Sequence, residues 1–154
     1  FNDPQLEFTS GDFVSIRGGR QSAKYYFSDP EITLKSAPER NVKFPGADLQ
    51  FNLSADDLIA LQKASAVYGL PDLTFQSEEG LDTIKLILRD KENDTSNTYD
   101  ITVGGNCTGT FSLDLKIENI RVLPGDYTVK VSKHLISEWI NTDVDLTYYI
   151  ALEP

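Results

Sequence analysis

The sequence predicts an α+β fold with antiparallel sheets, and three observations lead to this prediction. Most apolar residues alternate with polar ones over short runs, which is the period of half-buried strands. One stretch, residues 55–68, has a helical period with clear start and stop signals. The order strand, helix and three strands also occurs twice along the chain. We therefore expect a duplicated strand-helix-three-strand unit.

The predicted helix is bounded on both sides. Ser54, followed by Asp57 three positions later, forms a capping-box pattern at its start. Gly69 and Pro71 end it, because glycine favours the left-handed cap conformation and proline cannot continue a helix. One helical stripe is expected to face the core, and it consists of Leu58, Leu61 and Tyr68.

Strands are expected wherever apolar residues alternate. Before the helix the runs are LEF, FVSIR and RQSAKYYF within residues 5–27, with Gly18-Gly19 as a hairpin turn, and then LQFNL at 49–53. After the helix the runs begin near Leu73, Ile84, Tyr99, Phe111, Tyr127, Leu135 and Val144. The glycine-rich segment GGNCTGT, residues 104–110, is predicted to be a turn.

Two segments carry the repeat. LQFNLSADDLIAL (49–61) and FSLDLKIENIRVL (111–123) match at a constant spacing of 62 residues, which pairs Leu58 with Ile120 and Leu61 with Leu123. The following PDLTF (71–75) and GDYTV (125–129) match at a spacing of 54. The second copy has therefore lost about two helical turns, and a single short turn with Arg121 is expected there.

The chain is expected to contain parts of two domains. Residues 28–47 hold three prolines, mixed charges and little periodicity, so they are interpreted as an extended connector. This interpretation divides the sequence into 1–27, 28–47 and 48–154. The chain lacks a starting methionine and begins within an alternating pattern, which suggests that the first domain is incomplete.

The composition excludes several classes of function. One cysteine, Cys107, and one histidine, His134, cannot form an internal disulfide or a multi-histidine metal site. A formal charge of −10 argues against nucleic-acid binding over the whole surface. GGNCTGT lacks the Gly-Lys-Ser/Thr of a phosphate loop, and no carboxylate pair suggests catalysis. We expect a soluble, intracellular protein with no enzymatic activity and no cofactor.

Two other classes stay open at this point. A β-rich carbohydrate- or ligand-binding module is suggested by the late aromatic residues Trp139, Tyr148 and Tyr149, although aromatic residues in strands more often pack in a core. Such a module would need no helix at 55–68. A phage structural protein is the other alternative. The pattern Asn-x-Ser/Thr, which is the acceptor site for N-glycosylation in secreted proteins, occurs at Asn52, Asn93 and Asn106. The pattern is short enough to occur by chance.

The sequence resembles the DNA sliding clamps, and within them the polymerase processivity factors of large tailed bacteriophages. The resemblance is carried by FPGADLQFNLSADDLIALQKAS, by FSLDLKIENIRVLPGDYTVKV and by the terminal YYIALEP. It implies a DNA clamp (processivity) fold, in which residues 1–27 are the last strands of an incomplete N-terminal clamp domain, 28–47 the interdomain connector and 48–154 the C-terminal clamp domain.

The resemblance also implies where the chain acts. Helices of such clamps line the central hole, and the positions that match basic residues there are Lys63, Arg121 and, less closely, Lys116. A pocket for hydrophobic partner peptides would involve Ile32 and Leu34 of the connector with Ala151, Leu152 and Pro154.

Several partners follow from the same resemblance. They are duplex DNA bound without sequence preference, the tail of the replicative DNA polymerase, a clamp loader and late-transcription factors. The full-length protein is expected to form a homotrimer in the cytoplasm of the infected bacterial host.

Overall fold

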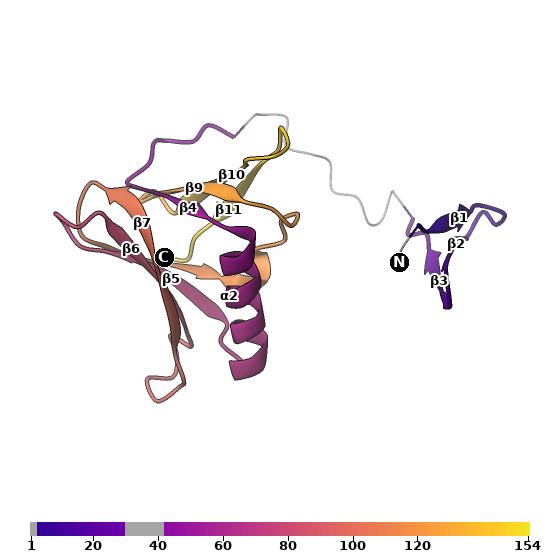
Figure 1. The fold of residues 1–154 in the computed structure, drawn as a ribbon, viewed down its shortest axis with the longest axis horizontal. Helices are drawn as coiled ribbons and strands as arrows, with labels where there is room; N and C mark the ends of the chain where they lie inside the picture. Colours follow the sequence, from indigo (N-terminus) through magenta and orange to yellow (C-terminus); the bar gives the residue numbers. More distant parts are fainter. Residues whose placement is uncertain (1–2, 30–41) are drawn as a thin grey trace. The chain divides into compact units, whose positions relative to one another are not determined.

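The computed structural model describes residues 3–29 and 42–154 (Figure 1). The chain divides into two compact units, Phe1–Asn41 and Val42–Pro154. The division falls inside the predicted connector, residues 28–47. Each unit contains its own sheet.

The first unit contains one three-stranded antiparallel sheet in the order β1-β2-β3. Its strands are β1 (Gln5–Glu7), β2 (Phe13–Gly18) and β3 (Gln21–Tyr26). The hairpin turn predicted at Gly18-Gly19 is one residue too early. Gly18 is paired with Gln21, so the two turn residues are Gly19 and Arg20, and Gly19 has the positive φ of 58° that the turn requires.

The second unit is an eight-stranded antiparallel sheet with one α-helix and one 3₁₀ turn (Figure 1). Its elements are β4 (Leu49–Leu53), α2 (Ala55–Tyr68), β5 (Asp72–Ser77), β6 (Thr83–Arg89), β7 (Tyr99–Cys107), β8 (Phe111–Lys116), η1 (Ile117–Asn119), β9 (Tyr127–Ser132), β10 (Ile136–Asn141) and β11 (Thr147–Ala151). The strand order is β11-β10-β9-β4-β7-β6-β5-β8.

The two copies of the repeat exchange strands reciprocally. Strand β4 of the first copy pairs with β9 of the second, and β8 of the second pairs with β5 of the first. The registers are equivalent as well, since Leu53 lies opposite Tyr127 just as its counterpart Leu115 lies opposite Leu73. The repeat predicted from the sequence is thus a structural repeat.

Helix α2 forms as predicted. The Ser54 side chain accepts a hydrogen bond from the backbone N–H of Asp57, and Gly69 ends the helix in the left-handed conformation. Leu58 and Leu61 are buried. The third member of the predicted stripe, Tyr68, is 52% exposed, because the last helical turn extends beyond the sheet-facing core and Ala64 is the last buried residue of the helix.

The second copy reduces this helix to the 3₁₀ turn η1, as the shortened spacing predicts. Ile120 is buried like its counterpart Leu58. Leu123 is 53% exposed, although its counterpart Leu61 is fully buried. Helical geometry ends after Asn119, so no further turn brings Leu123 back towards the core.

The sheet curves around one hydrophobic core that is also covered by α2. Phe51 of β4 and Phe75 of β5 are not neighbours in the strand order, yet their ring centroids lie 5.9 Å apart. Successive side chains of a strand point to opposite faces of its sheet. Those of β5, β6 and β8 accordingly alternate between this core and an outer face of the sheet.

The glycine-rich segment at 104–110 differs from its prediction. Strand β7 continues through Cys107, which pairs with Leu49, so only the later part of the segment forms the turn. Gly105 lies opposite Phe51, and a Cβ atom there would lie 2.6 Å from the Gln50 carbonyl oxygen. The glycine permits a close approach of two strands rather than a turn.

The last residues of the sequence close this sheet. The N–H of Leu152 donates to the Leu135 carbonyl (2.9 Å), and the N–H of Glu153 donates to the Asp114 carbonyl of β8 (2.8 Å). A bridge between Asp114 and Glu153 thus connects the two ends of the strand order. Across the described parts of the chain, no helix is long and apolar enough to cross a membrane.

Candidate functional site

Lys63 lies on the solvent-exposed side of α2, as predicted. Its helix is fixed at the N-terminal end by the second copy of the repeat, because Asp126 accepts a hydrogen bond from the Ala55 N–H at 2.7 Å. Of the ion pairs between described residues, none includes Lys63. The ammonium group is therefore available to a ligand.

Arg121 follows the 3₁₀ turn η1 and is exposed too. Its Nε donates to the Glu118 carbonyl at 3.1 Å, which orients the guanidinium and leaves its terminal nitrogens available. In the described part of the chain, no carboxylate forms an ion pair with Arg121.

The segment Ile117–Asp126 runs along α2. The N–H of Ile117 donates to the carbonyl of Pro71, beyond the C-terminal end of α2 (2.9 Å), and Asp126 binds the N-terminal end. The structure therefore places Lys63 and Arg121 on neighbouring segments, and both side chains are exposed. We refer to the surface formed by the exposed residues of α2 and 117–126 as the helical surface.

The helical surface carries no net positive charge. Around Lys63, the exposed residues of α2 are mostly uncharged or apolar, and Val67 is 77% exposed. Asp56, Glu118 and Asp126 add three exposed negative charges, one more than the positive charges of Lys63 and Arg121. Any polyanion on this surface would therefore be held by few charges.

Lys116 has a different environment from the other two cations. Leu115 points into the core, so Lys116 points to the outer face of the sheet, where its Nζ lies 2.6 Å from Oδ1 of the buried Asp72. The hydrogen bond to Asp72 raises the pKa of Lys116. Burial raises the pKa of Asp72, but the hydrogen bonds from Lys116 and the Lys91 N–H outweigh it, and the pKa lies below its usual value. The charge of Lys116 is already compensated.

The predicted partner-peptide pocket is described in part. Ile32 and Leu34 lie outside the described residues. Ala151 and Pro154 are exposed, whereas Leu152 is 7% exposed and belongs to the hydrophobic core. The exposed part of the segment 151–154 therefore consists mainly of Ala151 and Pro154.

Two further residues adjoin that segment and were missed by the sequence analysis. Leu135 has a φ of 62°, which is strained for a leucine, and its carbonyl binds Leu152. Lys91 forms an ion pair with Glu153 at 3.0 Å. Lys91 lies in the polar loop between β6 and β7, far from Glu153 in sequence, so no local pattern marks the pair.

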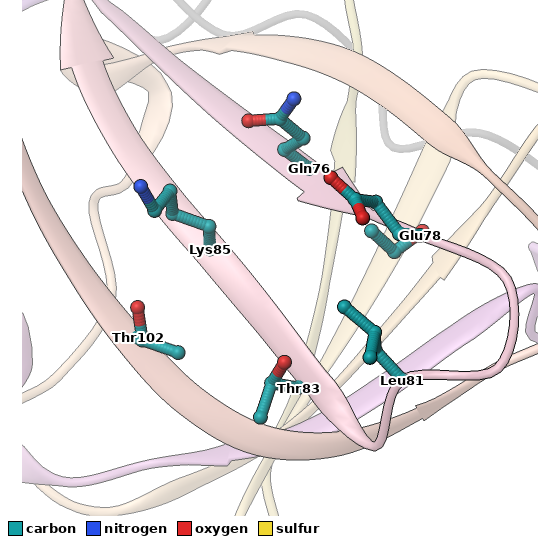
Figure 2. Close-up of a pocket in the computed structure, with 7 residues that line it drawn as sticks. Gln76, Glu78, Leu81, Thr83, Lys85 and Thr102 are labelled. Carbon is teal, nitrogen blue, oxygen red and sulfur yellow. The ribbon is translucent and has the colours of Figure 1, made fainter.

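A hollow of about 240 Å³ lies on the outer face of β5, β6 and β7. Most of the residues that line it are of polar type, and Figure 2 shows Gln76, Lys85 and Thr102 on three neighbouring strands. A second hollow of about 410 Å³ lies between the end of α2 and residues 116–118. Lys116 lines the second hollow, and neither hollow includes Lys63 or Arg121.

The groups considered for other functions have structural contacts. Trp139 is fully buried and its Nε1 donates to Ser137, so no exposed aromatic platform includes it. Cys107 contacts the carbonyls of Glu78 and Leu81. Within the described residues, no cluster of histidine, cysteine and carboxylate side chains could hold a metal ion.

Residues 50–154 match the family model of the gp45 sliding clamp, C-terminal domain. The chain belongs to this family of sliding clamps. The match covers the second structural unit, in which the repeat, α2 and η1 were recognised. The presence of α2 and the burial of Trp139 also remove the basis for a carbohydrate-binding module.

Among individual proteins, the chain is similar to the sliding clamp of Vibrio phage KVP40. The two are 29% identical over 156 residues, which cover 99% of this chain and 69% of the phage protein.

Solved clamp structures share the fold. Proliferating cellular nuclear antigen from Entamoeba histolytica has a TM-score of 0.58 at 12% identity, with 100% of this chain and 66% of that chain covered. The Helicobacter pylori beta clamp bound to a DNA ligase peptide has a TM-score of 0.54 at 17% identity, with 96% and 42% covered. The A. fulgidus clamp bound to the C-terminal region of FEN-1 has a TM-score of 0.53 at 11% identity, with 98% and 64% covered. The chain is thus shorter than each of these proteins.

Proposed function

We propose that this chain is part of a sliding clamp that encircles duplex DNA and tethers the replicative DNA polymerase for processive synthesis. The observation that carries the proposal is that Lys63 on α2 and Arg121 after η1, both exposed, form no ion pair with any residue in the described part of the chain. Tethering would raise the polymerase concentration at the primer end without any chemical step in the clamp.

The weak charge of the helical surface suits sliding. A ring that moves along DNA contacts phosphates loosely and does not read base edges, because base contacts would create sequence-dependent traps. Two available cations in this domain provide such contacts, and the formal charge of −10 keeps DNA away from the rest of the surface. Lys116 is the weakest of the three proposed DNA contacts, because its ammonium is engaged by Asp72.

DNA retention tests the proposal. The Lys63→Ala/Arg121→Ala variant of the ring-forming protein is loaded onto nicked plasmid, and the fraction retained is measured against salt concentration. We expect lower retention and a salt slope smaller by about 0.9 for each phosphate that is no longer neutralised. Lys130→Ala/Lys133→Ala removes the same number of cations from β9 and the turn after it, and is the control. An equal decrease in both variants would reject the assignment of DNA to the helical surface.

We propose that hydrophobic partner peptides dock beside the segment 151–154, together with Ile32 and Leu34. The support is the exposure of Ala151 and Pro154, and the resemblance to clamps that hold peptide tails. Among other proteins of this fold, one solved clamp binds a DNA ligase peptide and another binds the C-terminal region of FEN-1. A polymerase tail is the first expected occupant, and a clamp loader and late-transcription factors are further partners.

We propose that the full-length protein forms a homotrimeric ring. A ring of identical subunits needs two different complementary edges on each subunit. Residues 99–104 of β7 pair with β6 on one side and with no other described strand, and β3 pairs only with β2 among the described strands. These open edges allow a sheet to continue between subunits, with residues 1–27 as the end of the first clamp domain. The place of action in this proposal is the cytoplasm of an infected bacterium.

A further inference from the structure

The segment 151–154 has a structural role besides the docking proposed above, because it connects the β11 end of the eight-stranded sheet to β8 at the other end. Glu153 is bound at its backbone by the Asp114 carbonyl at 2.8 Å, and Leu152 by the Leu135 carbonyl at 2.9 Å. The first bond reaches β8 and the second reaches the start of β10. The position of Ala151 and Pro154 therefore depends on how firmly Glu153 is held.

The backbone partner of Glu153 is itself rigid. The Asp114 carboxylate accepts a hydrogen bond from Thr74 Oγ1 at 2.6 Å and from Arg89 Nη2 at 3.0 and 3.2 Å. These groups belong to three neighbouring strands, β5, β6 and β8. Glu153 is thus attached to a fixed point of the sheet.

The side chain of Glu153 is held by a different element. Its Oε2 lies 3.0 Å from Nζ of Lys91, in the loop between β6 and β7, and the two side chains are 32% and 25% exposed. The Lys91 backbone N–H donates to Oδ2 of Asp72 at 2.9 Å, and Asp72 is fully buried. The loop that carries Lys91 is therefore anchored to the sheet before its side chain reaches Glu153.

We propose that Lys91 is a positioning residue that holds the segment 151–154 in the geometry required for peptide docking. Without the ion pair, Glu153 keeps its backbone hydrogen bond to Asp114, but the segment 151–154 opens more often. A peptide that binds there must then order the segment, and this ordering lowers its affinity. The first half of this inference concerns the free protein alone. The second half rests on the docking surface proposed above.

Amide hydrogen exchange at Glu153 and Leu152, measured by NMR on the whole chain, tests the first half. The variant is Lys91→Gln, which keeps the side-chain stem and the backbone N–H to Asp72. We expect exchange at Glu153 to become about three- to fivefold faster, the effect of losing a partly exposed ion pair. Lys130→Gln is the matched control, since its Nζ lies 3.0 Å from Glu138, in an ion pair of the same length that does not include Glu153.

Two rescue variants distinguish positioning from a general loss of stability. Lys91→Arg, and the charge exchange Lys91→Glu with Glu153→Lys, should restore the exchange rate because each restores an ion pair. Unchanged exchange at Glu153 in Lys91→Gln would overturn the inference, and so would equal acceleration throughout the core.

Titration with a labelled peptide of the replicative polymerase's C-terminal residues tests the second half. We expect about threefold to fivefold weaker binding by Lys91→Gln and no such weakening in Lys130→Gln. Faster exchange with unchanged peptide affinity would confirm positioning and refute the docking location, whereas unchanged exchange with weaker affinity would refute positioning.

Discussion

Lys116 Nζ lies 2.6 Å from Oδ1 of Asp72, and the Asp72 carboxylate is completely buried on the outer side of β5. Asp72 also accepts the Lys91 N–H at 2.9 Å, so one carboxylate connects the end of β8 to the loop between β6 and β7. This buried carboxylate makes a specific contribution to stability that depends on pH.

Replacing Asp72 by Asn should lower the free energy of unfolding at pH 7 by about 2–3 kcal/mol, because Lys116 loses its counter-charge next to a buried site. The pKa of Asp72 lies below its usual value, so its contribution is present above about pH 4 and disappears as pH falls through the folded-state pKa. Urea unfolding between pH 3 and pH 7 should therefore show that the free energy of unfolding depends less steeply on pH in Asp72→Asn than in wild type.

Asp100→Asn is the control, because Asp100 forms an exposed ion pair with Lys85 at 3.5 Å. It should change the free energy of unfolding by less than about 1 kcal/mol. Parallel acid curves for wild type and Asp72→Asn would contradict this assignment.

Asp126→Ala should destabilise the protein by about 1 kcal/mol, although Asp126 lies far from α2 in sequence. Its carboxylate accepts the Ala55 N–H at 2.7 Å and favours the positive end of the helix dipole. Thermal unfolding and helical circular dichroism measure the effect. Asp145→Ala, an exposed carboxylate between β10 and β11, is the control. The same small effect in both variants would show that Asp126 does not stabilise α2.

Gly105→Ala should destabilise the protein by about 1–3 kcal/mol. The new Cβ atom would lie 2.6 Å from the Gln50 carbonyl oxygen and 2.8 Å from Ile84 Cδ1. Gly104→Ala is a close control, because nothing lies within 4 Å of a Cβ atom at that position. Chemical denaturation of both variants tests the role of Gly105. Equal stability would mean that β4 and β7 separate easily.

Thr102→Pro should reduce ring formation by the full-length protein. The Gly105 N–H donates to the Asp82 carbonyl, so the backbone donor of Gly105 lies on the β6 side of β7. Backbone N–H groups alternate between the two sides of a strand. The Thr102 N–H, three residues earlier, therefore points to the side of β7 where these residues pair with no other described strand. Proline removes that donor without removing a bond to β6. Light scattering after size exclusion should report a trimer for wild type and for Thr102→Val, and smaller species for Thr102→Pro. A stable Thr102→Pro trimer would exclude this edge from the interface.

Ile32→Ser with Leu34→Ser should weaken binding of a labelled polymerase tail peptide by about tenfold or more, because the apolar area available to the peptide decreases. Fluorescence anisotropy measures the affinity. Deletion of 151–154 is a poorer test, since it also removes the backbone bonds of Leu152 and Glu153 and should lower the unfolding temperature. An unchanged affinity in the double serine variant, with an unchanged unfolding temperature, would reject the connector as part of the pocket.

Much of the fold could be predicted because its signals are local or repeated. The capping pattern of Ser54 and Asp57, and the glycine that ends α2, are each set by a few neighbouring residues. The spacing between the copies also predicted that the second helix is reduced to about one turn, as η1 shows. The equivalent pairings of Leu53 and Leu115 follow from this repeat.

The burial of individual side chains could be predicted less well. Tyr68 continues the stripe of Leu58 and Leu61, yet it extends past the core and is exposed. Leu152 has the opposite outcome, because closure of the sheet at Glu153 places it inside the core. Periodicity shows which side of an element a residue occupies, but it does not show where the covering element ends.

The sequence by itself determined the order of strands and helices and the exposed positions of Lys63 and Arg121, and it located most element boundaries within one or two residues. The end of β7 and the start of β11 were exceptions. The tertiary structure decided that Lys116 is paired with Asp72, that Gly105 serves strand packing and that Lys91 holds Glu153. Local backbone preferences and hydrophobic periodicity act between residues a few positions apart. Charge pairing and close strand contacts depend on distances between residues that only the folded sheet brings together.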